Sequence, residues 1–233
     1  MSIKETMLNT PPTKAIFFDL DGTLVDTAPD FIVTMNELLA YYDQPPIAEP
    51  LIRATVSDGA RALVQLGFNL TPDDTGFEER RLRLLDIYND HMGKHCRLFP
   101  GMETLLQRIN QQQLTWGIIT NKPVRFAEPL IDMLSLTHPP ELLLCPEHVS
   151  KPKPDPEPME LACKTVNCAP NEAFYIGDHI RDIDSGNAAG NTTIAVSYGY
   201  IKAQDNINEW GADFIVDDVD SIWPIIEKHR EGS

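Results

Sequence analysis

The sequence predicts an α/β fold, a Rossmann-like doubly wound parallel sheet with an inserted all-helical cap domain. From Gly101 onward, short apolar runs alternate with amphipathic helical patterns, which is typical of parallel strands joined by right-handed crossovers. Residues 25–94 instead carry helical patterns and no convincing strand. Polar side chains also recur at the ends of the expected strands, and a parallel sheet collects those ends at one crevice. We therefore expect the functional groups to meet at one edge of the sheet.

The first core segment, residues 15–24, follows a polar tail over 1–14 and begins with an apolar strand that leads to Asp19 and Asp21. Strand alternation directs both carboxylates to the same side, while Gly22 lets the backbone turn and approach an anion. Two close carboxylates oppose each other's ionisation unless a cation or a proton separates them. The motif therefore implies a metal ion, a protonated acid, or both.

This acidic motif has two other interpretations. One is a strand that simply leaves the core through an acidic turn. The other is a calcium-binding loop, which needs further oxygen ligands at fixed spacing, and Val25, Ala28 and Pro29 do not fit that pattern. The residues beyond the motif decide among these interpretations.

The predicted cap, residues 25–94, starts with an amphipathic helix that has Thr27 as its N-cap and Pro29 in its first turn. The apolar positions of this helix recur at helical spacing and are Phe31, Ile32, Met35, Leu38, Leu39 and Tyr42. Further helical patterns cover residues 52–54, 60–66 and 77–92. The cap is therefore expected to be a small helical unit inserted after the first strand.

The second core segment, residues 95–233, alternates helices and strands. The expected strands are 115–119, 141–145, 173–176, 192–196 and 213–216. Between the second and third of these lies the stretch 151–158, in which four prolines argue against helix and central strand. We expect a stiff, extended loop there, which is either a plain linker or a support that holds Lys151 in place.

Composition limits the possible function classes. With 233 residues, of which 42% are hydrophobic, the chain can build a core without disulfides. The 4 cysteines form no C-x-x-C pair, so we expect reduced thiols in a cytoplasmic protein. The sequence shows neither a signal peptide nor a run of ~18 apolar residues, so no membrane segment is expected.

The charge balance bears on the partner. The chain carries 35 acidic and 19 basic residues, a net charge of −16, which repels nucleic acid and anionic membrane surfaces. An anionic substrate must therefore be captured by local cations. The expected partner is a small anionic metabolite, with no nucleic acid and no membrane.

Three further strand ends carry the groups that phosphoryl transfer needs. Thr120 and Asn121 end one strand at the start of a helix, where a hydroxyl and backbone amides can hold an anion. Lys151 follows the next strand and can neutralise phosphoryl oxygens. Asp178 ends another strand, with Asp182 on the following helix. Each of these residues alone also fits a helix cap or a solvated side chain, but together they point to one site.

These residues, in this order, resemble the four motifs of the haloacid dehalogenase (HAD) superfamily. The matching segments are Asp19-Leu20-Asp21-Gly22-Thr23, Thr120, Lys151, and Gly177-Asp178 with Asp182. The gap after the first motif suits the helical cap of that superfamily. The resemblance covers most of the chain and implies a HAD-like α/β core over 15–24 and 95–233.

The resemblance also implies a phosphatase whose catalytic residues are Asp19, Asp21, Thr120 and Lys151. Asp19 would take the phosphoryl group as an aspartyl phosphate, a form of covalent catalysis. Asp21 would protonate the leaving alkoxide and later accept a proton from water. The phosphoryl group would be bound by Thr120, Asn121 and Lys151.

The implied cofactor is Mg²⁺. Its expected ligands are Asp19, the backbone carbonyl of Asp21, and Asp178, and Asp182 is expected to support the site from behind. The metal and the lysine would offset the repulsion between an anionic nucleophile and a phosphate dianion.

Differences among the branches of the superfamily reduce the number of candidate activities. Asp21 argues against a dehalogenase, and the absence of any lysine between Leu24 and Gly93 argues against a phosphonatase. A phosphomutase shares all four motifs and stays open, as does a non-catalytic binding protein on the same fold. The general pattern resembles phosphoglycolate phosphatases. Three phrases outside the motifs resemble the N-acetylmuramic acid 6-phosphate phosphatases of bacterial cell-wall recycling, namely 26–31, 120–129 and 198–200.

Substrate choice is expected to depend on a loop of the cap near Ser57 and Arg61. The Arg61 guanidinium can bind a substrate carboxylate, which both candidate substrates carry. The alternative is that Arg61 is a surface charge and that Ser57-Asp58 caps its helix. Arg125, near the expected phosphate position, is a second candidate for substrate contact.

Overall fold

The computed structural model describes residues 13–231, so the predicted polar tail falls outside the described residues except for Thr13 and Lys14. A six-stranded parallel sheet forms the centre, in the order β5-β4-β1-β6-β7-β8. Its strands are β1 (Ala15–Phe18), β4 (Thr115–Ile119), β5 (Leu142–Leu144), β6 (Ala173–Gly177), β7 (Thr192–Val196) and β8 (Phe214–Val216). The sheet confirms the predicted α/β class.

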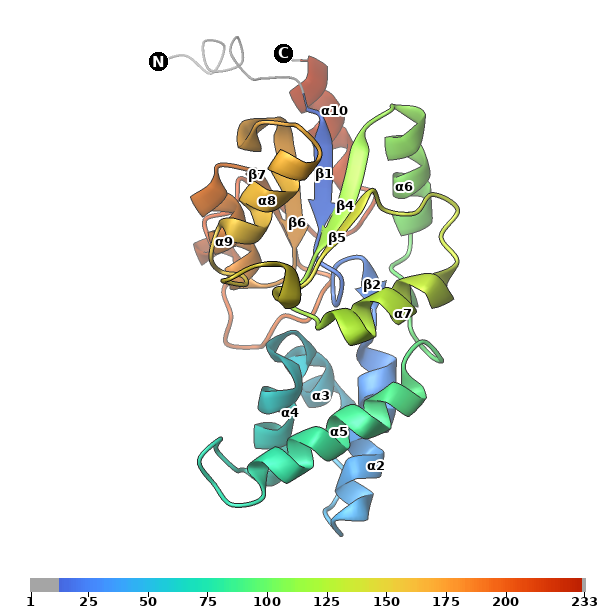
Figure 1. The fold of residues 1–233 in the computed structure, drawn as a ribbon, viewed down its shortest axis with the longest axis vertical. Helices are drawn as coiled ribbons and strands as arrows, with labels where there is room; N and C mark the ends of the chain where they lie inside the picture. Colours follow the sequence, from blue (N-terminus) through green and yellow to red (C-terminus); the bar gives the residue numbers. More distant parts are fainter. Residues whose placement is uncertain (1–12, 232–233) are drawn as a thin grey trace.

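Helices cover both faces of this sheet (Figure 1). One face packs against α8 (Glu157–Thr165) and α9 (Ile180–Ala189), and the other packs against α6 (Met102–Gln111) and α10 (Ile222–Glu231). Because helices lie on both sides, the central strand β1 is buried at all four of its residues and reads as continuously apolar. The remaining helices of the core are α7 (Val124–Leu134), η3 (Pro146–His148), η4 (Pro170–Glu172) and η5 (Ile207–Glu209).

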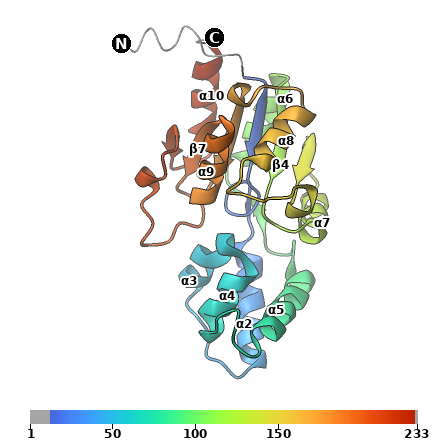
Figure 2. The same ribbon diagram turned by 60° about the vertical axis from the view of Figure 1, so that its left-hand side comes forward.

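Beyond the carboxyl ends of the strands lies a separate group of helices, which we call the cap helices (Figures 1 and 2). They are α2 (Ala28–Tyr41), α3 (Glu49–Thr55), η2 (Val56–Asp58), α4 (Gly59–Phe68) and α5 (Phe77–His91). The ring of Phe31 on α2 stacks on Tyr88 of α5 with centroids 4.1 Å apart. The chain enters and leaves this group through two short strands, β2 (Val25–Asp26) and β3 (Arg97–Leu98), which pair antiparallel.

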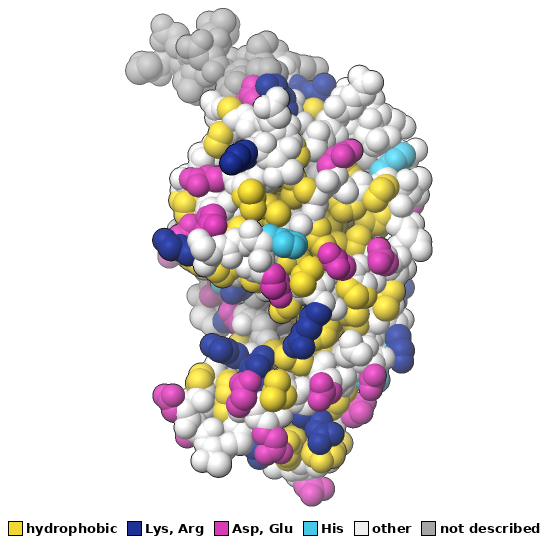
Figure 3. Space-filling view, in the orientation of Figure 1, with side chains coloured by type: hydrophobic (Ala, Val, Ile, Leu, Met, Phe, Trp, Pro, Cys, Tyr) yellow, Lys and Arg dark blue, Asp and Glu magenta, His cyan; other side chains and the backbone are white. Residues whose placement is uncertain are grey.

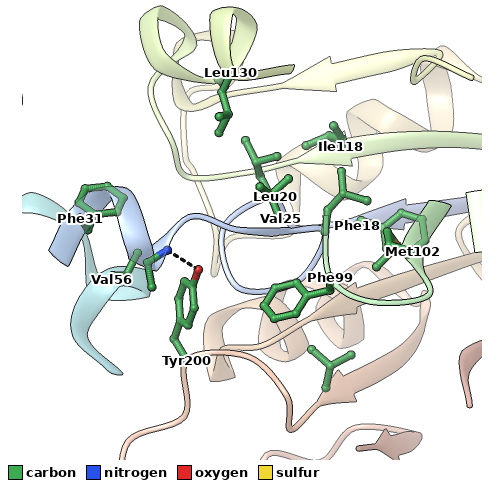
Figure 4. Close-up of a cluster of buried hydrophobic side chains, with 14 of the residues drawn as sticks. Phe18, Leu20, Val25, Phe31, Val56, Phe99, Met102, Ile118, Leu130 and Tyr200 are labelled. Carbon is green, nitrogen blue, oxygen red and sulfur yellow. Dashed lines mark hydrogen bonds between the residues drawn. The ribbon is translucent and has the colours of Figure 1, made fainter. Parts of the chain in front are cut away.

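Tyr200 fastens the start of the cap helices to the core (Figure 4). Its hydroxyl accepts hydrogen bonds from the backbone N–H groups of Thr27 (2.7 Å) and Ala28 (2.8 Å) and donates one to Asp26 (2.9 Å). Two of the unpaired donors near the N-terminus of α2 are therefore satisfied by a tyrosine far along the chain. The hydroxyl of Thr27, which the sequence predicts to cap this helix, donates instead to Asp21 Oδ1 at 2.5 Å.

Two local expectations were wrong. Helix α8 starts at Glu157, inside the proline-rich stretch, because proline is tolerated in the first turn of a helix, and Pro158 occupies that position. The strand β2 lies where no strand was expected, since two residues are too few to show alternation. The four cysteines are free thiols, as predicted, and no helix in the described part of the chain is long and apolar enough to span a bilayer.

Candidate active site

The candidate site lies where the carboxyl ends of three neighbouring strands face the cap helices. Asp19 directly follows β1, Thr120 follows β4 and Asp178 follows β6. The pairing of β1 with both β4 and β6 in register therefore brings these three side chains to one edge of the sheet. All three are buried.

Asp19, Asp178 and Asp182 form a compact group of buried carboxylates. One oxygen from each lies within 4.8 Å of the others. Burial, reinforced by the charges of Asp19 and Asp182, raises the pKa of Asp178 from 3.8 to about 7. Crowded carboxylate oxygens of this kind suit a hard divalent cation, whose charge would favour the ionised form of Asp178 and so oppose that shift.

Two glycines leave the space that Asp178 occupies. Gly22 has φ +84°, and a Cβ added there would lie 2.2 Å from Asp178 Oδ2. A Cβ on Gly199 would lie 2.2 Å from the Cβ of Asp178. The carboxylate is further fixed by Thr23, whose hydroxyl donates to Oδ1 (2.9 Å), and by the backbone N–H of Tyr200, which donates to Oδ2 (2.9 Å). These contacts hold a carboxylate in a pocket that has no room for a side chain at either glycine.

Asp182 is surrounded by donors of the protein itself. Its Oδ1 accepts hydrogen bonds from Lys153 Nζ (2.6 Å) and the Tyr175 hydroxyl (3.2 Å), and its Oδ2 accepts one from the His179 N–H (3.0 Å). The shortest of these contacts, to Lys153, fixes the ammonium group of that lysine.

The structure corrects the prediction that Lys151 neutralises the phosphoryl group. The Lys151 side chain is 71% exposed and its ammonium lies 3.5 Å from Asp155, outside the acidic group. Lys153 is the buried lysine, with Nζ 2.9 Å from Asp19 Oδ1 and 3.0 Å from the carbonyl of Ile119. In the repeat Lys-Pro-Lys-Pro, spacing alone does not reveal which of two equivalent lysines points inward.

The charge state of Lys153 follows from its surroundings. Burial opposes the ammonium form, but the carboxylates of Asp182 and Asp19 outweigh this effect and raise the pKa of Lys153 above its usual value. Lys153 is therefore a fixed cation beside Asp19.

Thr120 and Asn121 shape the loop that follows β4. The Asn121 side-chain amide donates to the carbonyl of Lys153 (2.9 Å) and so holds the backbone of the proline-rich stretch against this loop. The Thr120 hydroxyl accepts a hydrogen bond from the Lys122 N–H at 3.1 Å. The backbone N–H of Thr120, which we expected to face an anion, donates to Leu144 in the neighbouring strand at 2.9 Å. The expected anion contact of that amide is thus wrong.

Asp21 contacts a second buried lysine that the sequence reasoning missed. Lys122 Nζ lies 3.0 Å and 3.2 Å from the two oxygens of Asp21 and 2.8 Å from the hydroxyl of Tyr88. Burial opposes the charge of Lys122, yet Asp21 and Tyr88 raise its pKa above the usual value. Lys122 lies within the phrase 120–129, but the sequence assigned it no role, because a lysine at a helix start usually lies in solvent.

A cavity of about 680 Å³ opens from Asp19 and Asp21 into the space between core and cap. Its apolar wall includes Phe31, Tyr88 and Phe126. Four arginines also line it, which are Arg61, Arg81, Arg125 and Arg181. Basic side chains gather at this level of the molecule, between the sheet and the cap helices (Figure 3). Both predicted substrate contacts, Arg61 and Arg125, thus face the same cavity.

The cap loop around Ser57 and Asp58 is fastened to the core. The Ser57 hydroxyl donates to Asp178 Oδ2 (3.1 Å), and its carbonyl accepts a hydrogen bond from Arg181. Asp58 pairs with His179 (3.3 Å) and Lys202 (2.5 Å). Burial tends to raise the pKa of Asp58, but the hydrogen bonds from His179 and Lys202 prevail and lower it to about 2. The predicted Ser57 thus lies at the site, where it contacts a carboxylate of the acidic group.

Known proteins resemble this chain over most of its length. An N-acetylmuramic acid 6-phosphate phosphatase of Pseudomonas putida is 50% identical over 204 residues, covering 88% of this chain and 92% of the relative. A phosphoglycolate phosphatase of Xanthomonas campestris is 34% identical over 210 residues, covering 90% and 95%. The crystal structure of a predicted phosphoglycolate phosphatase from Haemophilus somnus superposes with a TM-score of 0.82 at 26% identity, covering 93% and 99%.

The family assignment rests on the core and the cap together. A model of the family described as haloacid dehalogenase-like hydrolase matches residues 16–196, a span that runs from β1 through the cap helices to β7. This span contains the acidic group, both buried lysines and the cavity. The chain therefore belongs to the haloacid dehalogenase-like hydrolase family.

Proposed function

We propose that this protein is a magnesium-dependent phosphatase that hydrolyses N-acetylmuramic acid 6-phosphate through an aspartyl phosphate on Asp19. The phosphatase class agrees with the named activities of its relatives. The observation that carries the proposal is the Asp19 carboxylate, buried beside Lys153 and Asp178 at the base of a large cavity. That arrangement supports a nucleophile facing an anionic substrate.

In the proposed first step, an oxygen of Asp19 attacks phosphorus and the sugar alkoxide leaves. Lys153 and Asp19 start as an ion pair, so the lysine is already in place to offset negative charge as the substrate dianion approaches. Asp21 gives a proton to the leaving oxygen. In the second step Asp21 takes a proton from water, the water oxygen attacks the same phosphorus, and Asp19 is released.

Asp19, the carbonyl of Asp21, and Asp178 would hold the metal ion. A bound Mg²⁺ supplies charge that offsets the repulsion between the carboxylate and the phosphate oxygens. The fit is supported by the oxygen-only donor set and by the raised pKa of Asp178, which burial causes first and the neighbouring charges of Asp19 and Asp182 reinforce. Ser57, from the cap, would then donate a hydrogen bond to Asp178, one of the carboxylates that hold the metal.

Cavity size favours the amino-sugar phosphate over phosphoglycolate. A volume of about 680 Å³ lies well inside the range of ~300–1,000 Å³ that is typical for ligands much larger than a two-carbon acid. A wall that offers both apolar rings and arginines suits a sugar ring that bears a carboxylate. The same arginines would serve the carboxylate of phosphoglycolate, which the 34% identical relative supports as the second candidate.

One substrate panel tests both levels of the proposal. The protein is assayed with p-nitrophenyl phosphate, N-acetylmuramic acid 6-phosphate, phosphoglycolate, a hexose 6-phosphate and pyrophosphate, each with Mg²⁺ and with EDTA. We expect release of inorganic phosphate that needs the metal, with the highest kcat/KM on N-acetylmuramic acid 6-phosphate. A clear preference for phosphoglycolate would reject the proposed substrate and retain the enzyme class.

The variant Asp19→Asn separates the mechanism from the substrate question. It is nearly isosteric, so we expect an unchanged circular dichroism spectrum and no turnover of any ester. Steady-state hydrolysis at the wild-type rate would reject Asp19 as the nucleophile. In the wild-type protein, phosphoryl transfer between sugar positions without release of inorganic phosphate would instead indicate a phosphomutase.

A further inference from the structure

We propose that Lys122 of the core and Tyr88 of the cap form a positioning pair that orients the Asp21 carboxylate when the cap is closed. The inference rests on the proposed function, because it assigns to Asp21 the proton transfers of that mechanism. Lys122 and Tyr88 act through Asp21 and need not contact the phosphoryl group.

The contacts of Lys122 show how it fixes Asp21. Its ammonium lies 3.0 Å and 3.2 Å from Oδ1 and Oδ2 of Asp21, so one donor group spans both oxygens. Thr27 adds a hydrogen bond to Oδ1 at 2.5 Å. Among the described residues, these two side chains are the hydrogen-bond donors to the Asp21 carboxylate, and Lys122 is the charged one.

The Lys122 ammonium is in turn held by the cap. It donates to the Tyr88 hydroxyl at 2.8 Å and lies over the rings of Tyr88 (4.7 Å) and Phe31 (5.2 Å). Tyr88 belongs to α5 and Phe31 to α2, whereas Lys122 belongs to the loop between β4 and α7. Two aromatic rings of the cap thus lie against a cation of the core, and the negative faces of such rings attract an ammonium group.

The consequence concerns cap movement. A lysine ammonium has three donor hydrogens, and removing the cap would strip Lys122 of the Tyr88 hydroxyl and of both ring faces. The flexible Lys122 side chain could then turn toward solvent and move away from Asp21. Closure of the cap over a substrate would restore the pair. Alignment of the acid and base would therefore be complete only when the substrate is enclosed.

The variant Tyr88→Phe isolates this role. It keeps the ring that stacks on Phe31 (4.1 Å) and packs on Phe126 (5.4 Å), and it removes only the hydroxyl that holds Lys122. Lys122→Met removes the ammonium at similar length. Tyr42→Phe is the matched control, because Tyr42 is another cap tyrosine whose hydroxyl donates to α5, at Glu79, far from Asp21.

The measurement compares two esters by kcat/KM, which reports the step that forms the aspartyl phosphate. p-Nitrophenolate leaves without a proton, whereas the alkoxide of N-acetylmuramic acid 6-phosphate needs one from Asp21. General acid catalysis contributes about 10²–10⁴-fold. We expect Lys122→Met to lose roughly 100-fold on the sugar phosphate and Tyr88→Phe roughly tenfold, with a clearly smaller loss in each variant on p-nitrophenyl phosphate.

Each outcome decides. A selective loss in both variants, absent in Tyr42→Phe, supports the positioning pair. Equal losses on the two esters indicate general damage to the site and overturn the inference, as does unchanged kcat/KM in Tyr88→Phe. Asp21→Asn keeps the two proposals apart, since a selective loss there with none in the pair rejects only the inference. No selective loss in Asp21→Asn rejects the role of Asp21 itself.

Discussion

At the scale of single residues, Lys153 has two functions in one position. It pairs with Asp19 at 2.9 Å, which prepares the site for an anion, and with Asp182 at 2.6 Å, which anchors the ammonium from below. Both carboxylates are buried, and the Lys153 ammonium pairs directly with each of them. The loss of Lys153 should therefore affect activity and folding together.

The two lysines of the proline-rich stretch give a matched pair of variants. Lys153→Met is expected to lower kcat/KM on p-nitrophenyl phosphate by more than about 100-fold and to destabilise the fold by roughly 3–5 kcal/mol. Lys151→Met is expected to stay within about twofold of the wild type, because its exposed ion pair with Asp155 is worth ~1 kcal/mol at most. Kinetics and urea denaturation measure both. A larger effect at Lys151 would contradict the structure.

The raised pKa of Asp178 predicts how stability depends on pH. The unfolded carboxyl titrates near 3.8 and the folded one near 7, so between these values the folded state holds a proton that the unfolded state has released. In EDTA, the melting temperature should thus fall as pH rises from about 5 to 7. Mg²⁺ binds the ionised carboxylates, so its stabilising effect should grow over the same range. A metal effect that is independent of pH would contradict this.

At the scale of elements, the turn after β1 restricts its residues as strictly as the strand does. Gly22 has a positive φ, and its missing Cβ leaves space for Asp178, which arrives from β6. The turn therefore combines two constraints, one on backbone conformation and one on distance between neighbouring strand ends.

A pair of glycine variants separates these constraints. Gly190, at the end of α9, has φ +86°, and an added Cβ there would meet nothing closer than 3.9 Å. Gly190→Ala should cost about 1–2 kcal/mol from backbone strain alone, with normal activity. Gly22→Ala should cost more and weaken Mg²⁺ binding, because the new methyl group displaces Asp178. Urea denaturation and metal titration measure the two effects. Equal costs at both positions, with normal metal binding, would contradict the second constraint.

The elements also show what sequence reasoning can reach. Strands β4 and β7 were predicted with their observed bounds, because buried parallel strands leave short apolar runs between turn residues. Asp19, Thr120 and Asp178 were expected at the ends of strands for the same reason, since each follows such an apolar run. Neither spacing nor hydrophobicity identified Lys153 over Lys151, because that choice depends on how a proline-rich loop folds onto the sheet.

Two other residues, Lys122 and Tyr200, were not identified from the sequence for a related reason. Both missed residues contact segments that are far away in the sequence. Lys122 and Tyr88 are separated by 34 positions, and Tyr200 and Thr27 by 173. Periodicity describes only neighbours within one element, so it carries no signal for such pairs. A lysine after a strand and a tyrosine in a loop look like ordinary surface residues until the fold is known.

At the scale of the whole molecule, Asp58 connects the cap to two separate segments of the core. Its partners are His179 at the start of α9 and Lys202 in the loop after β7. The loop that carries Ser57 and the helix that carries Arg61 are held over the cavity by these contacts. Their removal should favour an open arrangement of cap and core.

The variant Asp58→Ala tests this connection. Two partly exposed ion pairs are worth about 1 kcal/mol together, which changes the ratio of closed to open molecules roughly fivefold. We expect a larger radius of gyration in small-angle X-ray scattering without substrate and a raised KM. Asp73→Ala, at an exposed position of the cap, is the control. An unchanged scattering profile in Asp58→Ala would show that other contacts keep the cap closed.

The pairing of β2 with β3 has a consequence for how such proteins diversify. Within residues 13–231 the chain crosses between the two parts in two places, and the crossings lie side by side, with Asp26 opposite Arg97. The segment between these positions, which carries the cap helices, can therefore be exchanged as one unit, here called the cassette, without interrupting the central sheet. A chimera that joins this core to the cassette of a relative with another substrate should keep its chemistry and acquire the donor's preference, provided that the donor's counterparts of Tyr88 and Asp58 still meet Lys122 and Lys202.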